Sequence, residues 1–276
     1  MTTIAGLSEP ALRFGAFAGI FITMALLELW LPRRKLAHKR LTRWFTNLSM
    51  VGLGIATVRV IGAVAQLVAM PLIAVAAALF AEQQGWGLFN LVGLPFWLEV
   101  VLAICILDFA IWLQHVASHK IPIFWRLHQM HHADVDFDVT TALRFHPIEI
   151  GISMLWKVVC VLILGPAALA VVLFEVILNG SAMFNHANVK LPRWLDAIAR
   201  KVIVTPDMHR VHHSTDRVEH DMNYGFALSI WDRMFGTYQA QPAAGHEAMA
   251  IGLEPYQTPA PTKLGWSLAL PFWKLK

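Results

Sequence analysis

Long apolar runs constrain the fold of this chain more than any other feature. A helix needs roughly 20 residues to cross a bilayer core of about 30 Å. Only 14% of the residues are charged, whereas a typical soluble domain has about 25%. The sequence therefore predicts an all-α fold, an integral membrane helical bundle of about four spans. The apolar runs cover residues 14–31, 48–80, 95–114 and 148–178.

Two of these runs do not fit a single ordinary crossing. Residues 48–80 form either one tilted helix or a span that ends near Met70 and Pro71 and is followed by an interfacial helix. Residues 148–178 are interrupted by Gly165 and Pro166, which favours a helical hairpin that enters the membrane and returns to the same side. The first run lacks an early basic region and a small-residue cleavage site, so we expect a retained span.

The distribution of basic residues predicts the orientation. Six of them, and no acid, follow the first apolar run, so by the positive-inside rule this segment is cytoplasmic. The net charge of +4 comes from residues bunched between apolar runs, so we expect no nucleic-acid partner. Cys105 and Cys160 lie inside apolar runs without a CxxC partner, which argues against a disulfide or thiolate metal site.

Eight of the thirteen histidines fall into three tight groups. Residues three or four apart share one face of a helix, whereas adjacent residues diverge by about 100°. Neighbouring histidines can therefore serve different metals, and eight imidazoles exceed the needs of one ion. The spacing predicts a helical, histidine-rich cap on the cytoplasmic side that holds two metals. The groups are His115 and His119; His128, His131 and His132; and His209, His212 and His213.

The type of metal follows from what the clusters lack. A zinc hydrolase would normally show an HExxH pattern, and neither HxxHH cluster contains a glutamate. The axial histidines of a haem come singly from facing helices, which does not match the HxxHH clusters. Two irons with only nitrogen ligands fit these clusters better than a haem does. His146 and His186 can each be a metal ligand or have another role, and the spacing alone does not decide between these alternatives. His38, His220 and His246 stand alone, and we expect surface or satisfied core residues there.

Other polar residues have competing interpretations. Asp108 either receives an imidazole N–H or bonds to a neighbouring helix. Asp134, Asp136 and Asp138 follow the second cluster, where we expect a solvated acidic loop rather than carboxylates that orient the metal ligands. Two pairs are expected to brace the site: Arg144 with Glu149, supporting His146, and Asp232 with Arg233. The charges within apolar runs, at Glu28, Glu99, Glu175 and Arg59, fit a functional role, pairing between helices, or snorkelling of the side chain near a span end.

Several longer motifs accompany the clusters, and together they resemble the fatty acid hydroxylase/sterol desaturase superfamily over about residues 108–238. They are Phe124-Trp125-Arg126-Leu127-His128, Arg144-Phe145-His146-Pro147-Ile148-Glu149, His186-Ala187-Asn188, Thr205-Pro206-Asp207-Met208-His209, Asn223-Tyr224-Gly225 and Trp231-Asp232-Arg233-Met234-Phe235-Gly236-Thr237-Tyr238. The sequence shows no polar linker long enough to separate two domains. We therefore expect one domain over residues 1–276, with membrane spans in 1–94, a catalytic region that resembles this family in 95–240 and a C-terminal tail in 241–276.

The same resemblance implies a chemistry and a ligand set. It implies a non-haem di-iron centre, O2 as co-substrate, and two electrons from a separate reductase, ferredoxin or cytochrome. The substrate is a membrane lipid, which is hydroxylated or, alternatively, desaturated; a non-catalytic metal-binding or transport protein is the alternative of another class. The eight clustered histidines and His186 become metal ligands. Further candidates, as ligands or as residues that orient them, are His146, Asp108, Asn188 and Asp207.

Overall fold

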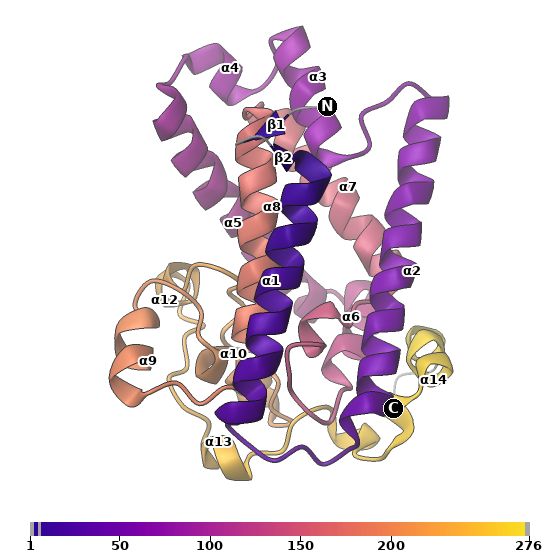
Figure 1. Cartoon of the computed structure of the whole chain (residues 1–276), viewed down its shortest axis with the longest axis vertical. Helices are drawn as coiled ribbons and strands as arrows, with labels where there is room; N and C mark the ends of the chain where they lie inside the picture. The colour runs from indigo at the N-terminus through magenta and orange to yellow at the C-terminus, as the bar shows by residue number, and fades with distance from the viewer. Residues whose placement is uncertain (1–2, 5–6, 274–276) are drawn as a thin grey trace.

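The fold is a bundle of long helices with a compact cap at one end (Figure 1). A computed structural model describes residues 3–4 and 7–273. Within that part of the chain, five helices are long and apolar enough to cross a membrane. They are α1 (Glu9–Trp30), α2 (Arg40–Leu67), α5 (Phe96–Lys120), α7 (Pro147–Leu164) and α8 (Ala168–Asn185). The all-α membrane bundle is confirmed, with one more apolar helix than the four spans expected.

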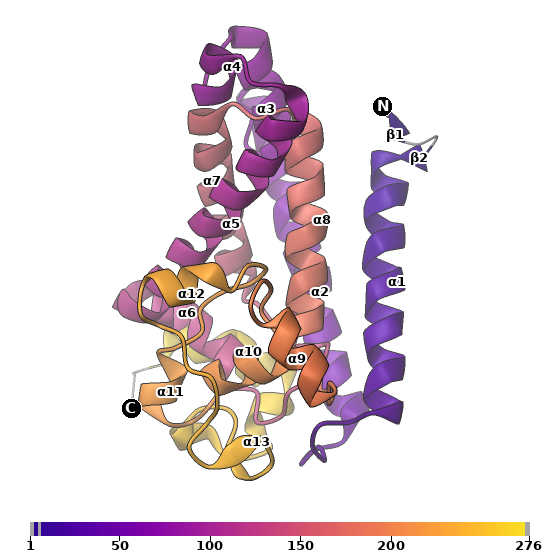
Figure 2. The same ribbon diagram turned by 90° about the vertical axis from the view of Figure 1, so that its left-hand side faces the viewer.

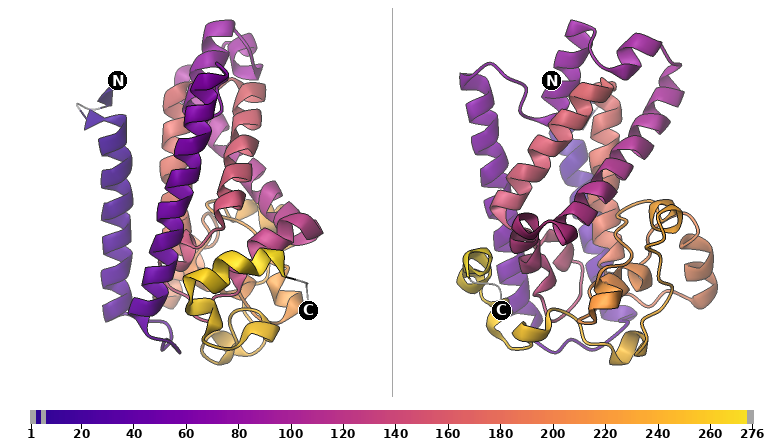
Figure 3. Two further views of the ribbon diagram at one scale, coloured as in Figure 1. Left: turned by 90° about the vertical axis from the view of Figure 1, so that its right-hand side faces the viewer. Right: turned by 180° about the vertical axis from the view of Figure 1, so that it is seen from behind.

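The fifth helix arises because both halves of the 148–178 run are long enough to count as spans. Gly165 ends α7 with φ 61°, a left-handed conformation that glycine adopts without a Cβ penalty. A Cβ at Gly165 would also lie 2.2 Å from the carbonyl oxygen of Trp86, so only glycine fits this turn. The helices α7 and α8 form a hairpin that starts and ends at the cap (Figures 1 and 3).

The long apolar run 48–80 is broken near Met70 and Pro71, so the alternative of one tilted helix is wrong. Helix α2 ends at Leu67, Ala69 has φ 51°, and Pro71 follows. Helix α3 (Ala74–Gln84) then packs against α7 and α8 through alanines without exposed surface, among them Ala77 and Ala78. The short α4 (Leu88–Val92) completes the end of the bundle opposite the cap (Figure 1).

The cap gathers the segment between α5 and α7 and the segment after α8 at one end of the bundle (Figure 2). Residues 241–273 pack onto it, since Arg126 and Arg144 donate hydrogen bonds to the carbonyls of Pro271 and Pro261. The cap contains α6, α9 to α14 and four 3-10 turns. The bounds are α6 (Pro122–His132), α9 (Arg193–Ala199), α10 (Pro206–His212), α11 (Arg217–His220), α12 (Ile230–Met234), α13 (Gly245–Ala248), α14 (Leu264–Ala269), η1 (Thr141–Leu143), η2 (Glu254–Tyr256), η3 (Ala260–Thr262) and η4 (Leu270–Phe272). A pair of antiparallel two-residue strands, β1 (Thr3–Ile4) and β2 (Leu7–Ser8), precedes α1.

The apolar core and the buried polar groups occupy different parts of the molecule. The largest cluster of buried apolar side chains lies between α3, α5, α7 and α8. Buried polar side chains concentrate in the cap, where every histidine of the three sequence clusters is at most 3% exposed. Two of the charges within apolar runs serve the backbone: Glu28 accepts from the amides of Val139 and Asn188, and Glu99 from Ala167.

Candidate metal centre

Nine histidines from four elements converge in the cap. Helix α5 carries two, α6 carries three, the C-terminal end of α8 carries one, and α10 with the residue after it carries three. Their ring nitrogens form two sets, each with its ligand atoms within 4.8 Å of one another. The five-histidine group is His115, His119, His128, His132 and His212. The four-histidine group is His131, His186, His209 and His213.

Adjacent histidines belong to different groups. His131 and His132 lie on α6 one residue apart, and their rings are perpendicular at 90°. His212 and His213 are also split between the groups, with an angle of 83° between their rings. The divergence of neighbouring side chains on a helix thus builds two sites from two short sequence clusters.

The orientation of the imidazoles tests whether the site fits metal ions. In the five-histidine group, the Nδ1 atoms of His115 and His212 lie 2.6 and 2.8 Å from the backbone carbonyls of Tyr224 and Met222. A carbonyl can only accept, so each neutral ring carries its proton on Nδ1. The Nε2 atoms of His115 and His212 nevertheless lie 3.1 Å apart. Two lone pairs therefore face each other.

The four-histidine group shows the same conflict. His131 and His186 direct Nδ1 at the carbonyls of Arg144 and Ala182, at 3.3 and 2.8 Å, while their Nε2 atoms are 3.2 Å apart. A cation between the converging lone pairs resolves the repulsion in both groups. Imidazole suits Fe, Zn, Cu and Ni, so both groups fit transition-metal ions.

Protonation does not resolve this conflict. Burial lowers the pKa of His128 and of His186 to about 3. Burial and neighbouring imidazoles also hold the pKa values of His209 and His213 well below their usual range. Neutral imidazole is the form that binds metals, so the cap keeps its histidines ready for coordination at neutral pH.

A carboxylate on α7 orients one ligand of the five-histidine group. Glu149 Oε1 lies 2.7 Å from His128 Nδ1, the arrangement in which a carboxylate holds a metal-binding imidazole. The predicted pair of Arg144 with Glu149 is wrong. Arg144 instead donates to the Met130 carbonyl and to Asn47, at 3.0 and 2.9 Å. The physical reason is that α7 turns Glu149 toward α6, whereas Arg144 points toward α2 and the C-terminal segment.

His146 lies outside both groups of imidazoles. Its Nδ1 accepts a hydrogen bond from the backbone amide of Ile148 at 3.2 Å, so the residue caps the N-terminus of α7. Such a cap satisfies one of the free amides at the start of a helix. Among the residues that the structure describes, no hydrogen bond joins the His146 ring to the side chain of Arg144 or Glu149.

Asp108 and Asp232 hold the segment that orients His115. Asp108 Oδ2 accepts hydrogen bonds from the amide of Leu228 and from Trp231 Nε1, at 3.1 and 2.9 Å. Of the two alternatives for Asp108, these bonds favour pairing with a neighbouring element over pairing with an imidazole. Asp232 accepts from the amides of Tyr224 and Gly225, both at 2.9 Å. These bonds place the Tyr224 carbonyl against His115.

The predicted pair of Asp232 with Arg233 is wrong. Arg233 Nη2 donates to the carbonyl of Arg200 at 2.8 Å, while both carboxylate oxygens of Asp232 serve backbone amides. The two side chains are adjacent on α12, and adjacent residues on a helix face different directions.

Asp134, Asp136 and Asp138 do not form a solvated loop, as the sequence had suggested. All three are buried, at 1%, 4% and 0% exposure. Arg43 on α2 donates to Asp134 at 2.9 and 2.8 Å and to Asp138 at 2.5 Å. Although burial raises the pKa of Asp134, Arg43 outweighs this and lowers it to about 2. The partner lies 91 residues away, so the sequence pattern could not reveal it.

Asn188 and Asp207 connect the cap to the basic segment after α1. Asn188 exchanges two hydrogen bonds with the backbone of Arg34, at 3.1 and 2.8 Å. Asp207 accepts from Arg33 at 3.2 Å and also pairs with Arg210. Asp207 does not belong to either histidine group.

His220 stands alone in the sequence, where we expected a surface or satisfied core residue, but it lies beside the five-histidine group. It is 2% exposed, and its ring centroid is 4.5 Å from that of His132 and 4.8 Å from that of His119. With His119 and Asp221 it forms a third set of clustered ligand atoms. Its sequence signal is weak because it reaches the site from α11 without a spacing that relates it to other histidines. The other two histidines set aside pair with carboxylates: His38 with Asp136 and His246 with Asp207.

A large cavity leads from the five-histidine group into the bundle. It has a volume of about 870 Å³ and is lined by α1, α2, α5, α7 and α8. His115 and His128 border it, and most of its wall is formed by apolar side chains such as Phe17 and Met154. None of the four-histidine group lines it. Only the five-histidine group therefore meets a molecule in the cavity.

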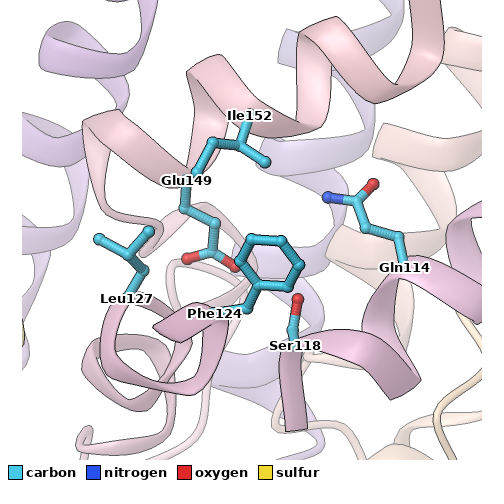
Figure 4. A pocket seen from close by; sticks show the side chains of 6 residues that line it. All are labelled: Gln114, Ser118, Phe124, Leu127, Glu149 and Ile152. Carbon is cyan, nitrogen blue, oxygen red and sulfur yellow. The ribbon is translucent and has the colours of Figure 1, made fainter. Parts of the chain in front are cut away.

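A second, small pocket adjoins the cavity at Glu149 (Figure 4). Its volume of about 30 Å³ suits one or two water molecules. Glu149, Gln114 and Ser118 border both hollows, so the carboxylate that orients His128 lies between the large cavity and the small pocket. The lining residues are Gln114, Ser118, Phe124, Leu127, Glu149 and Ile152.

Comparison with known proteins adds independent information. The family model described as fatty acid hydroxylase matches residues 100–237. Human alkylglycerol monooxygenase is 29% identical over 199 residues, covering 68% of this chain and 41% of the relative. An ornithine lipid hydroxylase of Rhizobium tropici is 28% identical over 221 residues, covering 79% of this chain and 64% of the relative.

A third relative catalyses a different outcome. A Delta(7)-sterol 5(6)-desaturase of Aspergillus fumigatus is 30% identical over 180 residues, covering 62% of this chain and 50% of the relative. The chain thus spans less than two thirds of the length of each of these relatives. No solved structure matches it.

Proposed function

The chain belongs to the fatty acid hydroxylase family, and from that premise we propose that it is a membrane-bound, O2-dependent lipid hydroxylase with two iron ions. The observation that carries the proposal is the pair of converging imidazole groups, one of which borders a largely apolar cavity. Relatives named for hydroxylation of alkylglycerol and ornithine lipid support a lipid substrate.

The two histidine groups would each hold one iron. Bound iron supplies the activation of O2, which redox-inert zinc cannot supply. In the overall reaction one oxygen atom enters a C–H bond of the lipid and the other leaves as water, with two protons and two electrons from a separate reductase, ferredoxin or cytochrome. The protein's own part is to keep the imidazoles neutral and oriented, through the Tyr224, Met222, Arg144 and Ala182 carbonyls.

The cavity would hold the apolar chain of the substrate. Its volume of about 870 Å³ lies within the range of roughly 300–1,000 Å³ typical of small-molecule sites. Its apolar walls exclude water and direct the chain toward His115 and His128. Positioning a bond beside the oxidising centre accounts for selectivity among many similar C–H bonds.

We place the cap on the cytoplasmic side of the membrane. The segment between α1 and α2 lies at the cap end and is rich in arginine and lysine, whereas residues 68–95, at the opposite end, contain neither. This asymmetry follows the positive-inside rule. A soluble electron donor would then approach the cap from the cytoplasm.

Desaturation is the second candidate, and the sterol desaturase among the relatives favours it. In that reaction two hydrogens leave the lipid and both oxygen atoms end as water. The position of the substrate relative to the metals decides between the outcomes, so the two reactions share all the residues named above.

The test is lipid analysis of a host that expresses the chain under labelled O2. We expect a hydroxylated lipid that carries one labelled oxygen atom, absent when His131 is replaced by alanine. An unoxygenated alkene would select desaturation. If the lipids stay unchanged although the protein contains two irons and receives electrons, the chain would instead be a non-catalytic metal-binding protein.

A further inference from the structure

The cavity carries a group of charged side chains at the end remote from the histidines. Glu175 on α8 accepts from Arg13 Nη1 on α1 at 2.8 Å and from Lys157 Nζ on α7 at 2.6 Å. Arg13 also pairs with Glu9 at 2.9 Å. All four side chains line the cavity. We call Glu9, Arg13, Lys157 and Glu175, together with Arg59 on α2, the charged end of the cavity.

Arg59 gives this end a surplus of positive charge. It lies on α2 and lines the same cavity, and no carboxylate lies within 4.0 Å of its guanidinium among residues 3–4 and 7–273. The charged end thus holds three cations, Arg13, Lys157 and Arg59, against the two carboxylates of Glu9 and Glu175. One positive charge remains for an outside partner.

The position of these charges within the span makes them costly. Glu175 lies seven residues after the start of α8, which is about 10 Å into the apolar helix at 1.5 Å per residue. Ionisable residues inside a membrane are expensive and usually serve a substrate or ion. Ion pairing between helices explains Glu175, Arg13 and Lys157, but it does not explain Arg59.

The distance to the histidines matches an extended chain. Glu175 precedes His186, at the cap end of α8, by eleven residues, or about 16 Å along the helix. His186 does not line the cavity, so this length measures how far the charged end lies from the cap. Apolar side chains, including Phe17, Ile20 and Met183, line the cavity. An amphiphile with its polar group at the charged end would extend its apolar chain toward His115 and His128.

We propose that the charged end of the cavity binds the anionic group of an amphiphilic lipid, a carboxylate or a phosphate. This inference deepens the proposed function and rests on it for the meaning of the site as a substrate site; binding itself does not depend on catalysis. The lipid would be oxidised at a carbon far along its chain from the anionic group.

The test compares the binding of three probes with the same sixteen-carbon chain to the full-length protein in neutral detergent. Palmitate and hexadecyl phosphate are anionic, and hexadecanol is neutral. We expect at least one anionic probe to bind about tenfold more tightly than hexadecanol. The stronger of the two identifies the source of the anionic group.

Arg59→Gln is the decisive variant because Arg59 has no ion-pair partner to leave unpaired. We expect it to bring the Kd of the preferred anion to that of hexadecanol while the Kd of hexadecanol stays unchanged, which also reports an intact cavity. Arg193→Gln, on α9 and outside the cavity, is the matched control and should keep the preference. Equal binding of all three probes, or a preference that survives Arg59→Gln, would overturn the proposal.

Repeating the measurement with His131→Ala separates this inference from the proposed function. The anion preference should persist in that variant, because the charged end lies apart from the histidines. If the wild type oxidises no lipid but keeps the preference, the proposed function fails alone. If it oxidises lipids without any anion preference, the present inference fails alone.

Discussion

The two histidine groups have similar chemistry but different surroundings. In the five-histidine group, His115 and His128 border the cavity. The four-histidine group is enclosed: Phe145 stacks on His131 with centroids 4.5 Å apart, and Phe137 lies 5.4 and 5.0 Å from the rings of His186 and His213. Only the ion in the five-histidine group would therefore be close to a substrate in the cavity. The ion in the four-histidine group would lie behind the first ion, away from the cavity.

The largest expected effect comes from removing one ligand from each group. His132→Ala and His213→Ala should each lower lipid oxidation by more than about 100-fold, the upper range for loss of a residue that merely orients a ligand. Metal analysis should find one ion per chain in each variant, against two in the wild type. Loss of both ions from either variant would make the two groups a single site.

The two histidine groups can also be compared through the free energy of unfolding of the metal-free protein, which we expect to fall on acidification. Burial lowers the pKa of His128 and of His186 to about 3, against about 6.5 in an unfolded chain. The unfolded state therefore binds more protons between these values, and stability is lost as the pH falls below 6.5. From pH 7 to 5, each imidazole should lower the free energy of unfolding by about 2 kcal/mol.

Denaturant unfolding of chelator-treated protein at the two pH values measures this loss. His128→Gln and His186→Gln should reduce it by similar amounts, because one residue comes from each group and both are fully buried. A much smaller reduction in one variant would show that its group opens to water without metal. The metal-loaded protein, whose imidazoles resist protonation, is the control.

Asp232→Asn should weaken the five-histidine group selectively. Its carboxylate holds the amides of Tyr224 and Gly225, and an amide group would turn a donor toward one of them. Because the Tyr224 carbonyl orients His115, we expect a 10- to 100-fold loss of affinity for one ion. Chelator competition measures it, with Glu247→Gln, whose side chain is 71% exposed, as the control. Equal weakening of both ions would contradict the distinction between the groups.

Glu149→Gln should have the smallest effect, a loss of activity of several-fold. The amide oxygen of glutamine can still accept from His128 Nδ1, but without the full charge of the carboxylate. Steady-state rates of lipid oxidation provide the measurement. A loss as large as that of His132→Ala would mean that Glu149 binds the metal itself.

The sequence predicted the parts of this site that depend on local geometry. Spacings of three and four residues identified His115 with His119 and His209 with His212 as neighbours on one helix face, and the apolar runs identified the spans. It could not predict contacts between distant segments. Arg43 reaches Asp134 across 91 residues, and His220 approaches His132 from another helix. These depend on how the helices pack, which no single spacing encodes.

The break in the 48–80 run shows the same limit. Its length excluded one ordinary crossing, but only the packing of Ala77 and Ala78 against α7 and α8 separates a tilted helix from two helices. Small residues that allow close approach look no different in sequence from other apolar positions.

Anomalous diffraction at the iron edge, from crystals of the iron-loaded protein, tests the central claim most directly. The account predicts two peaks per chain, one among His115, His119, His128, His132 and His212 and one among His131, His186, His209 and His213. A single peak shared by both groups, or a peak at His146 in place of either, would contradict it.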